Sequence, residues 1–146
     1  MAKASPDMIF LAADYAKARL VHPYLGVTIP TYSTSQINSG KNEPGKDIDL
    51  NGIQFVDMPW LLQPDHPAVM IYPHQEKFFS ADYERLYALG IDAYRLADIL
   101  LTSPNRNITL DGVTGKITLS GDNQVMRELT PGVFRQGIAT LLSAGQ

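Results

Sequence analysis

The sequence predicts an α/β domain with a mostly parallel sheet flanked by helices and an antiparallel hairpin near its C-terminal end. Three observations predict this class. Residues 8–13 form a continuous apolar run, which is typical of a parallel strand covered on both faces. Residues 81–101 carry apolar side chains at helical spacing. Residues 115–120 alternate as a strand, and a Gly-Asp-Asn turn leads back into a second strand at 125–129.

The elements between the first strand and the long helix follow from local signals. Asp14 can cap a helix over residues 15–21, and Pro23 is expected to end or kink it. Residues 29–35 predict a second strand, because β-branched and aromatic side chains predominate there. Residues 36–46 are rich in Asn, Gly, Ser and Pro, so we expect a surface loop.

A third strand is predicted after the Asn51-Gly52 turn. Residues 53–56 alternate between two faces, and Pro59 stops the strand because it cannot donate to a sheet ladder. Asp57 and Trp60 are therefore expected at the carboxyl edge of the sheet, where open α/β sheets form their binding crevice. A further short strand is expected at residues 133–135.

The long helix is expected to provide much of the core. Ser80 is a suitable N-cap, and Gly90 lies on the apolar stripe, where close approach to a sheet would offset its cost of roughly 1 kcal/mol. The stripe itself runs from Leu86 to Leu100. The residues expected in the core are Phe10, Leu11, Ile53, Phe55, Leu86, Leu89, Ala93 and Leu96.

Composition limits the classes of function. The 146 residues suffice for one compact domain, and a net charge of −3 with mixed signs provides no basic stripe for nucleic acid. The longest apolar runs are far below the ~18 residues that suggest a membrane span. The absence of cysteine excludes disulfides and thiolate chemistry within these residues.

Catalytic motifs are not found. The three histidines, His22, His66 and His74, lack the spacing of a helical zinc site, and no serine stands in a Gly-x-Ser-x-Gly elbow. Neither phosphate-binding glycine motif occurs. We therefore expect a protein without enzymatic activity, bound metal or cofactor.

The candidate ligand- or partner-binding residues are Tyr32, Ser33, Ser35, Asp57 and Trp60. Hydroxyls and a carboxylate at the end of a sheet have the chemistry that holds a small polar ligand. Trp60 has two interpretations: its ring anchors a ligand or partner, or it covers the end of the sheet as ordinary core, which we favour. The loop at 36–46, with Trp60, is expected to present a mobile edge beside the crevice.

Two segments are especially specific: 49–60, with Asp-Leu-Asn-Gly-Ile-Gln-Phe followed by Asp-Met-Pro-Trp, and 85–96, Arg-Leu-Tyr-Ala-Leu-Gly-Ile-Asp-Ala-Tyr-Arg-Leu. Together with other segments in the right order, they resemble the penicillin-binding-protein activator lipoproteins of the LppC/LpoA family. The resemblance covers about residues 6–137. It departs from the family pattern at Thr130-Pro131-Gly132, where a more apolar stretch is expected.

The resemblance implies part of a type I periplasmic-binding-protein-like fold and a non-catalytic activator of a class A penicillin-binding protein, which supports peptidoglycan cross-linking. It also implies a periplasmic protein held at the outer membrane through a lipid anchor that is absent from this chain. Since residues 1–7 carry no export signal, residues 1–146 are expected to be a single domain excised from the C-terminal portion of a larger two-lobed module. The alternative is a periplasmic solute-binding protein of the branched-chain amino-acid transport type, with a small-molecule ligand.

Overall fold

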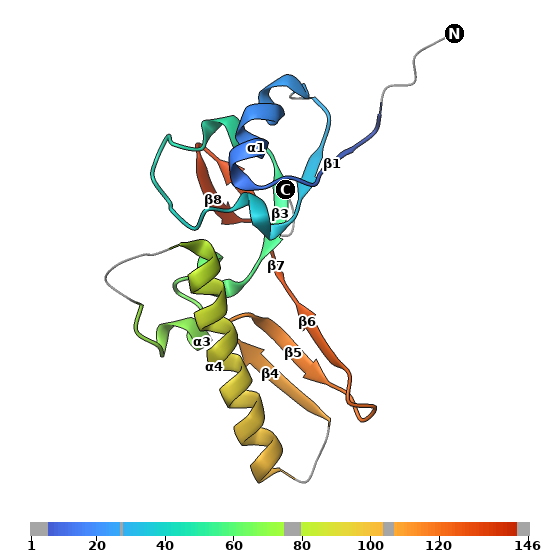
Figure 1. The fold of residues 1–146 in the computed structure, drawn as a ribbon, viewed down its shortest axis with the longest axis vertical. Helices are drawn as coiled ribbons and strands as arrows, with labels where there is room; N and C mark the ends of the chain where they lie inside the picture. The colour runs from blue at the N-terminus through green and yellow to red at the C-terminus, as the bar shows by residue number, and fades with distance from the viewer. Residues whose placement is uncertain (1–5, 27, 75–79, 104–106, 143–146) are drawn as a thin grey trace. The chain divides into compact units, whose positions relative to one another are not determined.

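The computed structural model describes residues 6–26, 28–74, 80–103 and 107–142 (Figure 1). The single domain expected from the sequence contains two compact units. Unit 1 comprises residues 1–57 and 131–146, and unit 2 comprises residues 58–130. The chain leaves unit 1 after three strands, forms unit 2, and returns to add two more strands to the first sheet.

Unit 1 is built on a five-stranded sheet in the order β1-β2-β3-β7-β8. The β1/β2 and β2/β3 pairs are parallel, as predicted, and the β7/β8 pair is antiparallel. The strand predicted at residues 133–135 lies within β7, whereas β8 was not predicted. The strands are β1 (Ile9–Leu11), β2 (Thr31–Ser33), β3 (Gln54–Asp57), β7 (Thr130–Arg135) and β8 (Ile138–Leu141). β7 begins at Thr130, where the resemblance to the family pattern departs.

One helix and three short 3-10 segments accompany this sheet. The predicted helix is confirmed as α1 (Tyr15–Val21), with the Asp14 carboxylate accepting from the Lys17 amide. The chain then continues through Pro23 as η1 (His22–Tyr24), so the proline ends the α-helix but not the turn. α1 packs against η2 (Ser35–Ile37) and η3 (Ile48–Leu50).

The two faces of this parallel sheet differ. The register places Phe10 beside Tyr32 and Tyr32 beside Gln54, so these side chains share one face. That face is open to solvent, and Phe10, predicted as core, is 60% exposed. Leu11 is only half-buried.

Ile53 and Phe55 are buried as predicted, and the Phe55 ring lies 5.0 Å from that of Phe134. The periodicity of a strand identifies its two faces but does not say whether a partner covers each of them, which is why Phe10 was assigned wrongly.

Unit 2 combines the long helix with an antiparallel sheet in the order β4-β5-β6. The hairpin of β5 (Gly115–Leu119) and β6 (Val125–Glu128) was predicted. β4 (Ile108–Gly112) was not, because the turn signals at residues 111–115 masked its short alternation. Short helices α2 (Pro59–Leu62) and α3 (Pro67–Met70) complete the unit.

The long helix is confirmed as α4 (Ala81–Thr102), and the Ser80 hydroxyl accepts from the Tyr83 amide at its N-terminus. In Figure 1 it runs beside β4 and β5. In the part of the chain that the structure describes, neither α4 nor a shorter helix combines the length and apolarity that spanning a bilayer requires.

The face of α4 that packs inward is not the predicted one. Leu86 is 65% exposed, Leu89 is 48% exposed, Ala93 is exposed and Leu96 is half-buried. The buried residues of the helix are instead Ala81, Glu84, Ala88 and Asp92. The helix was predicted correctly, but the stripe predicted to be buried lies on its exposed side. Hydrogen bonds made by Glu84 and Asp92 turn a different face inward.

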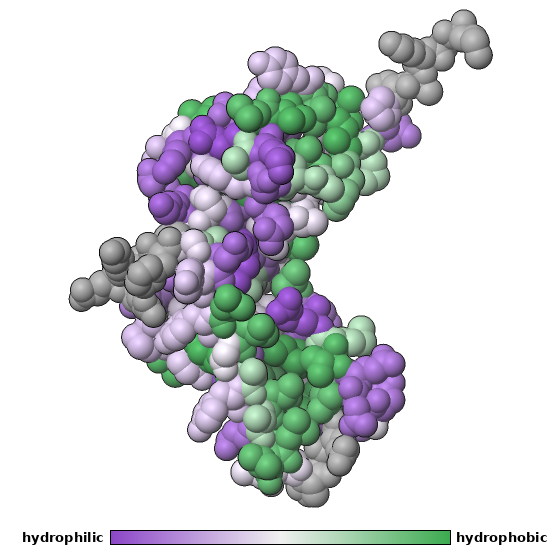
Figure 2. Space-filling model, in the orientation of Figure 1, coloured by the Kyte–Doolittle hydropathy of each residue, from purple (hydrophilic) through white to green (hydrophobic). Residues whose placement is uncertain are grey.

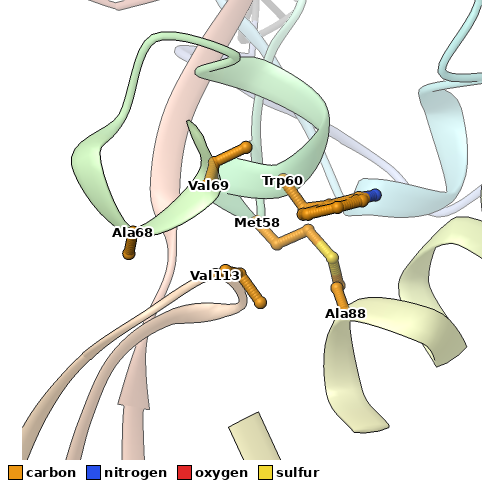
Figure 3. Close-up of a cluster of buried hydrophobic side chains, with 6 residues drawn as sticks. All are labelled: Met58, Trp60, Ala68, Val69, Ala88 and Val113. Atoms are coloured by element: carbon orange, nitrogen blue, oxygen red, sulfur yellow. The ribbon is translucent and has the colours of Figure 1, made fainter. Parts of the chain in front are cut away.

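The core of unit 2 forms where four elements meet (Figure 3). Met58 points toward Ala88 of α4, and Val113 of the β4–β5 turn lies below the Trp60 ring. The cluster consists of Met58, Trp60, Ala68, Val69, Ala88 and Val113. Small residues predominate in it, so α4 can approach the turn closely.

Candidate functional site

Two of the predicted site residues lie at the carboxyl ends of parallel strands, as expected. The Ser33 hydroxyl donates to the Leu11 carbonyl at 2.7 Å, and Asp57 Oδ2 accepts from Asn38 Nδ2 at 3.0 Å. Ser33, Asn38 and Asp57 are all buried. These groups therefore join the ends of β1 and β2 and fasten the following loop to β3, rather than facing solvent at the crevice.

The remaining predicted residues of unit 1 do not converge with them. Tyr32 lies on the open face of the sheet, where it lines a hollow of about 140 Å³ with Gln54 and Val56. Ser35 begins η2. Ser33 also borders this hollow, but consecutive residues of a strand point to opposite faces, so the side chains of Tyr32 and Ser33 lie on different sides of the sheet.

Trp60 belongs to the core of unit 2, so its second interpretation is confirmed and an exposed edge at Trp60 is excluded. Its side chain is only 3% exposed. The indole N–H donates to Glu84 Oε2 at 2.7 Å, and the ring stacks on His74 with centroids 4.1 Å apart. The backbone N–H of Trp60 donates to the Val113 carbonyl at 2.9 Å.

The local sequence explains why Trp60 turns inward. Pro59 ends the strand, as predicted, but it also takes the first position of α2, where its fixed φ suits a helix. The helical turn then carries Trp60 away from the edge of the sheet and toward α4. Pro59 predicted the end of the strand correctly, whereas its second role as a helix start was missed.

A second buried carboxylate, Asp92, was not identified from the sequence. It is fully buried on α4 and accepts from the backbone N–H of Val113 at 3.1 Å and of Thr114 at 2.7 Å. The Thr114 hydroxyl donates to it at 2.7 Å, and Arg95 Nη1 lies 3.2 Å from its other oxygen. Asp92 thus caps the β4–β5 turn from the side of the helix, and its charge is compensated by these four donors.

The sequence offered one indirect signal for this contact. Gly112 and Gly115 flank the turn, and a Cβ at Gly112 would lie 2.7 Å from the Gly115 carbonyl oxygen and would collide with Asp92 Oδ2. Glycine at this position therefore permits close approach of a side chain to the backbone. Spacing alone could not have shown which acidic residue approaches.

The loop at 36–46 is exposed at Gln36 and again throughout its second half. Ile37 and Asn38 are buried, whereas residues 41–46 are exposed. Asn38 holds one end through Asp57, and the Gly45 N–H donates to the Gln136 carbonyl at 3.4 Å at the other. The predicted surface loop is thus confirmed for residues 41–46, and it is anchored at both ends.

The chain that follows this loop is fixed by a buried carboxylate. The Tyr15 hydroxyl donates to Asp47 Oδ1 at 2.5 Å, and Arg19 Nη2 lies 3.1 Å from Asp49 Oδ2. Burial, followed by this hydrogen bond to Asp47, raises the pKa of Tyr15. The hydrogen bond to Asp49 raises the pKa of Arg19. Tyr15 therefore stays protonated and neutral, Arg19 stays positively charged, and both hold the base of the loop to α1.

Among the described residues, no three His, Cys, Asp or Glu side chains come together in a way that could hold an ion. The buried carboxylates Asp47, Asp57, Glu84 and Asp92 are each taken up by hydrogen bonds within their own unit.

Comparison with known sequences gives a consistent relationship. Residues 2–137 match the family model described as "LppC putative lipoprotein". Penicillin-binding protein activator LpoA of Pantoea ananatis is 30% identical over 142 residues, and that of Vibrio cholerae is 31% identical over 136 residues. The aligned regions cover 90% and 85% of this chain but only 20% and 21% of those relatives, so the chain spans about a fifth of their length.

Solved structures resemble this fold. A Chromobacterium violaceum protein described as a "putative branched-chain amino acid ABC transporter" is 45% identical with a TM-score of 0.76, covering 88% of this chain and 42% of its own. The LpoA C-domain of Haemophilus influenzae, at 19% identity, shares the fold with a TM-score of 0.74, covering 95% of this chain and 45% of its own. Because the family model matches nearly the whole chain, the protein belongs to the LppC family.

Proposed function

We propose that the protein containing this chain activates a class A penicillin-binding protein without catalysing a reaction itself, and so promotes peptidoglycan cross-linking. The observation that carries this proposal is the match of residues 2–137 to the LppC family, together with relatives named penicillin-binding protein activators. The lipoprotein family places the protein in the cell envelope. Attachment to the outer membrane from the periplasmic side, through a lipid carried outside these residues, belongs to the proposal.

An activator must present a surface that binds the active state of the synthase better than its inactive state. Residues 41–46 meet the physical requirements for part of such a surface. They are exposed, they carry Lys41, Glu43 and Lys46, and both ends of the segment are anchored to the sheet of unit 1. A polar loop held on a rigid scaffold loses little entropy on binding. Trp60 is not included, because its ring is buried.

The proposal can be tested by exchange with a relative. A chimera of Pantoea ananatis LpoA would carry this chain in place of the matched fifth, and cross-linked muropeptides made by the class A synthase of that organism would be measured. We expect stimulation with the chimera. Replacing Lys41, Glu43 and Lys46 by alanine should reduce it several-fold. The matched control replaces Lys116 and Glu128, a cross-strand pair on the outer face of the other sheet, and should leave stimulation unchanged.

One result would contradict the activator role, and another would contradict only the assignment of its contact surface. One is a folded chimera that fails to stimulate the synthase. The other is equal stimulation by the loop variant, which would exclude residues 41–46 as the contact surface while leaving the activator role intact.

The alternative function is binding of a small amino acid, and the 45% identity to the Chromobacterium violaceum protein favours it. In that case Tyr32, Ser33, Ser35 and Asp57 would be the candidate ligand contacts. The geometry gives this alternative less support, since Ser33 and Asp57 are buried in internal hydrogen bonds and Tyr32 lies on the opposite face. Micromolar binding of leucine by the chimera in calorimetry, without stimulation of the synthase, would make it the better account.

A further inference from the structure

The outward face of α4 carries a large exposed apolar surface. Seven large apolar side chains of α4 are exposed to solvent: Tyr83, Leu86, Tyr87, Leu89, Tyr94, Leu100 and Leu101. In Figure 2, green hydrophobic atoms gather where α4 and the β4–β6 sheet lie. Soluble proteins rarely leave contiguous apolar patches of this kind uncovered, and such patches mark interaction surfaces.

Small residues run along the middle of this face. Gly90, Ala93 and Ala97 are exposed between the larger side chains, and a Cβ built at Gly90 would meet nothing within 4 Å. A glycine in the middle of a helix costs about 0.5–1 kcal/mol relative to alanine, with no compensating contact inside unit 2. A neighbour that approaches the helix backbone closely would explain why the smallest residue stands there.

Apolar grooves flank the same face on both sides. On one side, Leu89, Ala93 and Leu96 of α4 and Ile117 and Val125 of the sheet line a groove of about 390 Å³. All four residues of β6 are exposed, so α4 leaves the inner face of this strand uncovered. On the other side, a groove of about 560 Å³ is lined mainly by Tyr72, Leu86, Tyr87, Ile91 and Tyr94.

Unit 1 also has an apolar face that is left uncovered by the described residues. Its parallel strands carry Phe10, Tyr32 and Val56 on a face that no described element covers fully, while η2 contacts β3 and α1 packs on η2 and η3. Parallel sheets occur almost only where both faces are covered. Two separate units thus each lack one layer.

We propose that the outward face of α4 is the packing surface for the polypeptide that completes this two-lobed module. The occupant corresponds to the part of the Chromobacterium violaceum and Haemophilus influenzae chains that the match leaves uncovered. This chain accounts for 42% and 45% of those chains at TM-scores of 0.76 and 0.74, so more than half of each similar structure is available to supply the covering layer.

A second copy of this chain is a less suitable occupant. A two-fold dimer pairs one patch with the same patch on the other copy. Such pairing through α4 would leave the parallel sheet of unit 1 with a bare face, and pairing through that sheet would leave α4 exposed. One continuous polypeptide that contributes a layer to each unit covers both.

A cysteine reporter tests the proposal cleanly, because the chain has no cysteine of its own. Leu89→Cys marks the outward face of α4. Met126→Cys is the matched control, since Met126 is 65% exposed and lies on the outer face of the sheet, opposite Val125 and Arg127. Each variant is prepared in this chain alone and in a fusion in which a cysteine-free version of the uncovered Chromobacterium violaceum segment precedes it. Maleimide labelling rates are then compared.

We expect the labelling rate at Leu89→Cys to fall at least tenfold in the fusion, while the rate at Met126→Cys changes less than twofold. Equal labelling at Leu89→Cys in both proteins would overturn the proposal, as would a fusion that sediments only as aggregate. In the chain alone, protection at Leu89→Cys that increases with protein concentration, together with dimers in sedimentation, would assign the face to a second copy instead.

Discussion

In most amphipathic helices the inward face is apolar and the outward face is polar. The two faces of α4 show the reverse arrangement. The inward face consists of two alanines and two carboxylates, Ala81, Ala88, Glu84 and Asp92, and the outward face carries the leucines and tyrosines. Each inward carboxylate has a specific partner: Glu84 accepts from the Trp60 indole, and Asp92 accepts from the β4–β5 turn. The orientation of the helix within unit 2 is therefore determined by short polar contacts and close approach, not by the amount of apolar area buried.

The two faces of α4 show what an apolar stripe in a sequence does and does not indicate. A stripe at helical spacing indicates that some neighbour covers that side of the helix in the assembled molecule. It does not indicate that the neighbour lies within the same 146 residues. Variants on the two faces should behave differently, and the expected changes in the free energy of unfolding can be ranked.

The largest effect is expected for Trp60→Ala. The substitution removes a buried indole and leaves the buried Glu84 carboxylate without its 2.7 Å donor, so unfolding in denaturant should show a loss of about 3–5 kcal/mol. Tyr94→Ala is the control on the outward face and should change stability by less than about 0.5 kcal/mol. Similar losses for the two variants would show that the faces of α4 have been assigned wrongly.

Asp92→Ala is expected to be nearly as costly. It leaves the buried N–H groups of Val113 and Thr114 without an acceptor, and each unsatisfied group costs about 1–3 kcal/mol, so a total loss of about 2–6 kcal/mol is expected. The control is Asp98→Ala, which removes an exposed carboxylate from the same helix. Amide hydrogen exchange should also accelerate at Val113 and Thr114. Unchanged protection there would exclude Asp92 as the cap of the turn.

Ala88 and Leu89 are adjacent in the sequence but lie on different faces of α4, so substitutions at these two residues compare the faces most directly. Ala88 is fully buried, so Ala88→Leu should overpack the core and cost about 1–3 kcal/mol. Leu89→Ala would cost ~2–5 kcal/mol at a fully buried site. At a side chain 48% exposed we expect less than about 1 kcal/mol in this chain alone. A larger loss for Leu89→Ala than for Ala88→Leu would restore the sequence-based assignment of the core.

The fold was predictable wherever one short segment carried its own signal. The Ser80 cap and the apolar spacing fixed α4 to within a residue, and Asp14 fixed α1. The hairpin of β5 and β6 followed from alternation and a turn. The choice of buried face at Phe10 and Leu89 was not predictable, since it depends on which neighbours are present and not on the segment itself.

The candidate site likewise contains features that one segment specifies by itself and features that depend on distant neighbours. Asp57 lies at the end of its strand as expected, but its partner Asn38 comes from a loop that carries no pairing signal in the sequence. Trp60 follows Asp57 by three residues yet belongs to another unit, because Pro59 begins a helix there. Asp92 could not be distinguished from a solvated helix carboxylate, since its donors come from a turn some 20 residues later.

The smallest expected effect has the opposite sign and concerns Gly90. In this chain alone a Cβ at residue 90 enters open space, so Gly90→Ala should stabilise the protein by about 0.5–1 kcal/mol through its effect on the helix. If a neighbour packs against the outward face in the complete module, the same methyl group would meet that neighbour, and the gain should disappear or reverse in the fusion with the Chromobacterium violaceum segment. Denaturant titration of Gly90→Ala and of the unsubstituted protein, each in the chain alone and in the fusion, measures the difference. An equal gain in the fusion would mean that no neighbour approaches the helix at Gly90, and the outward face would then remain open in the assembled molecule as well.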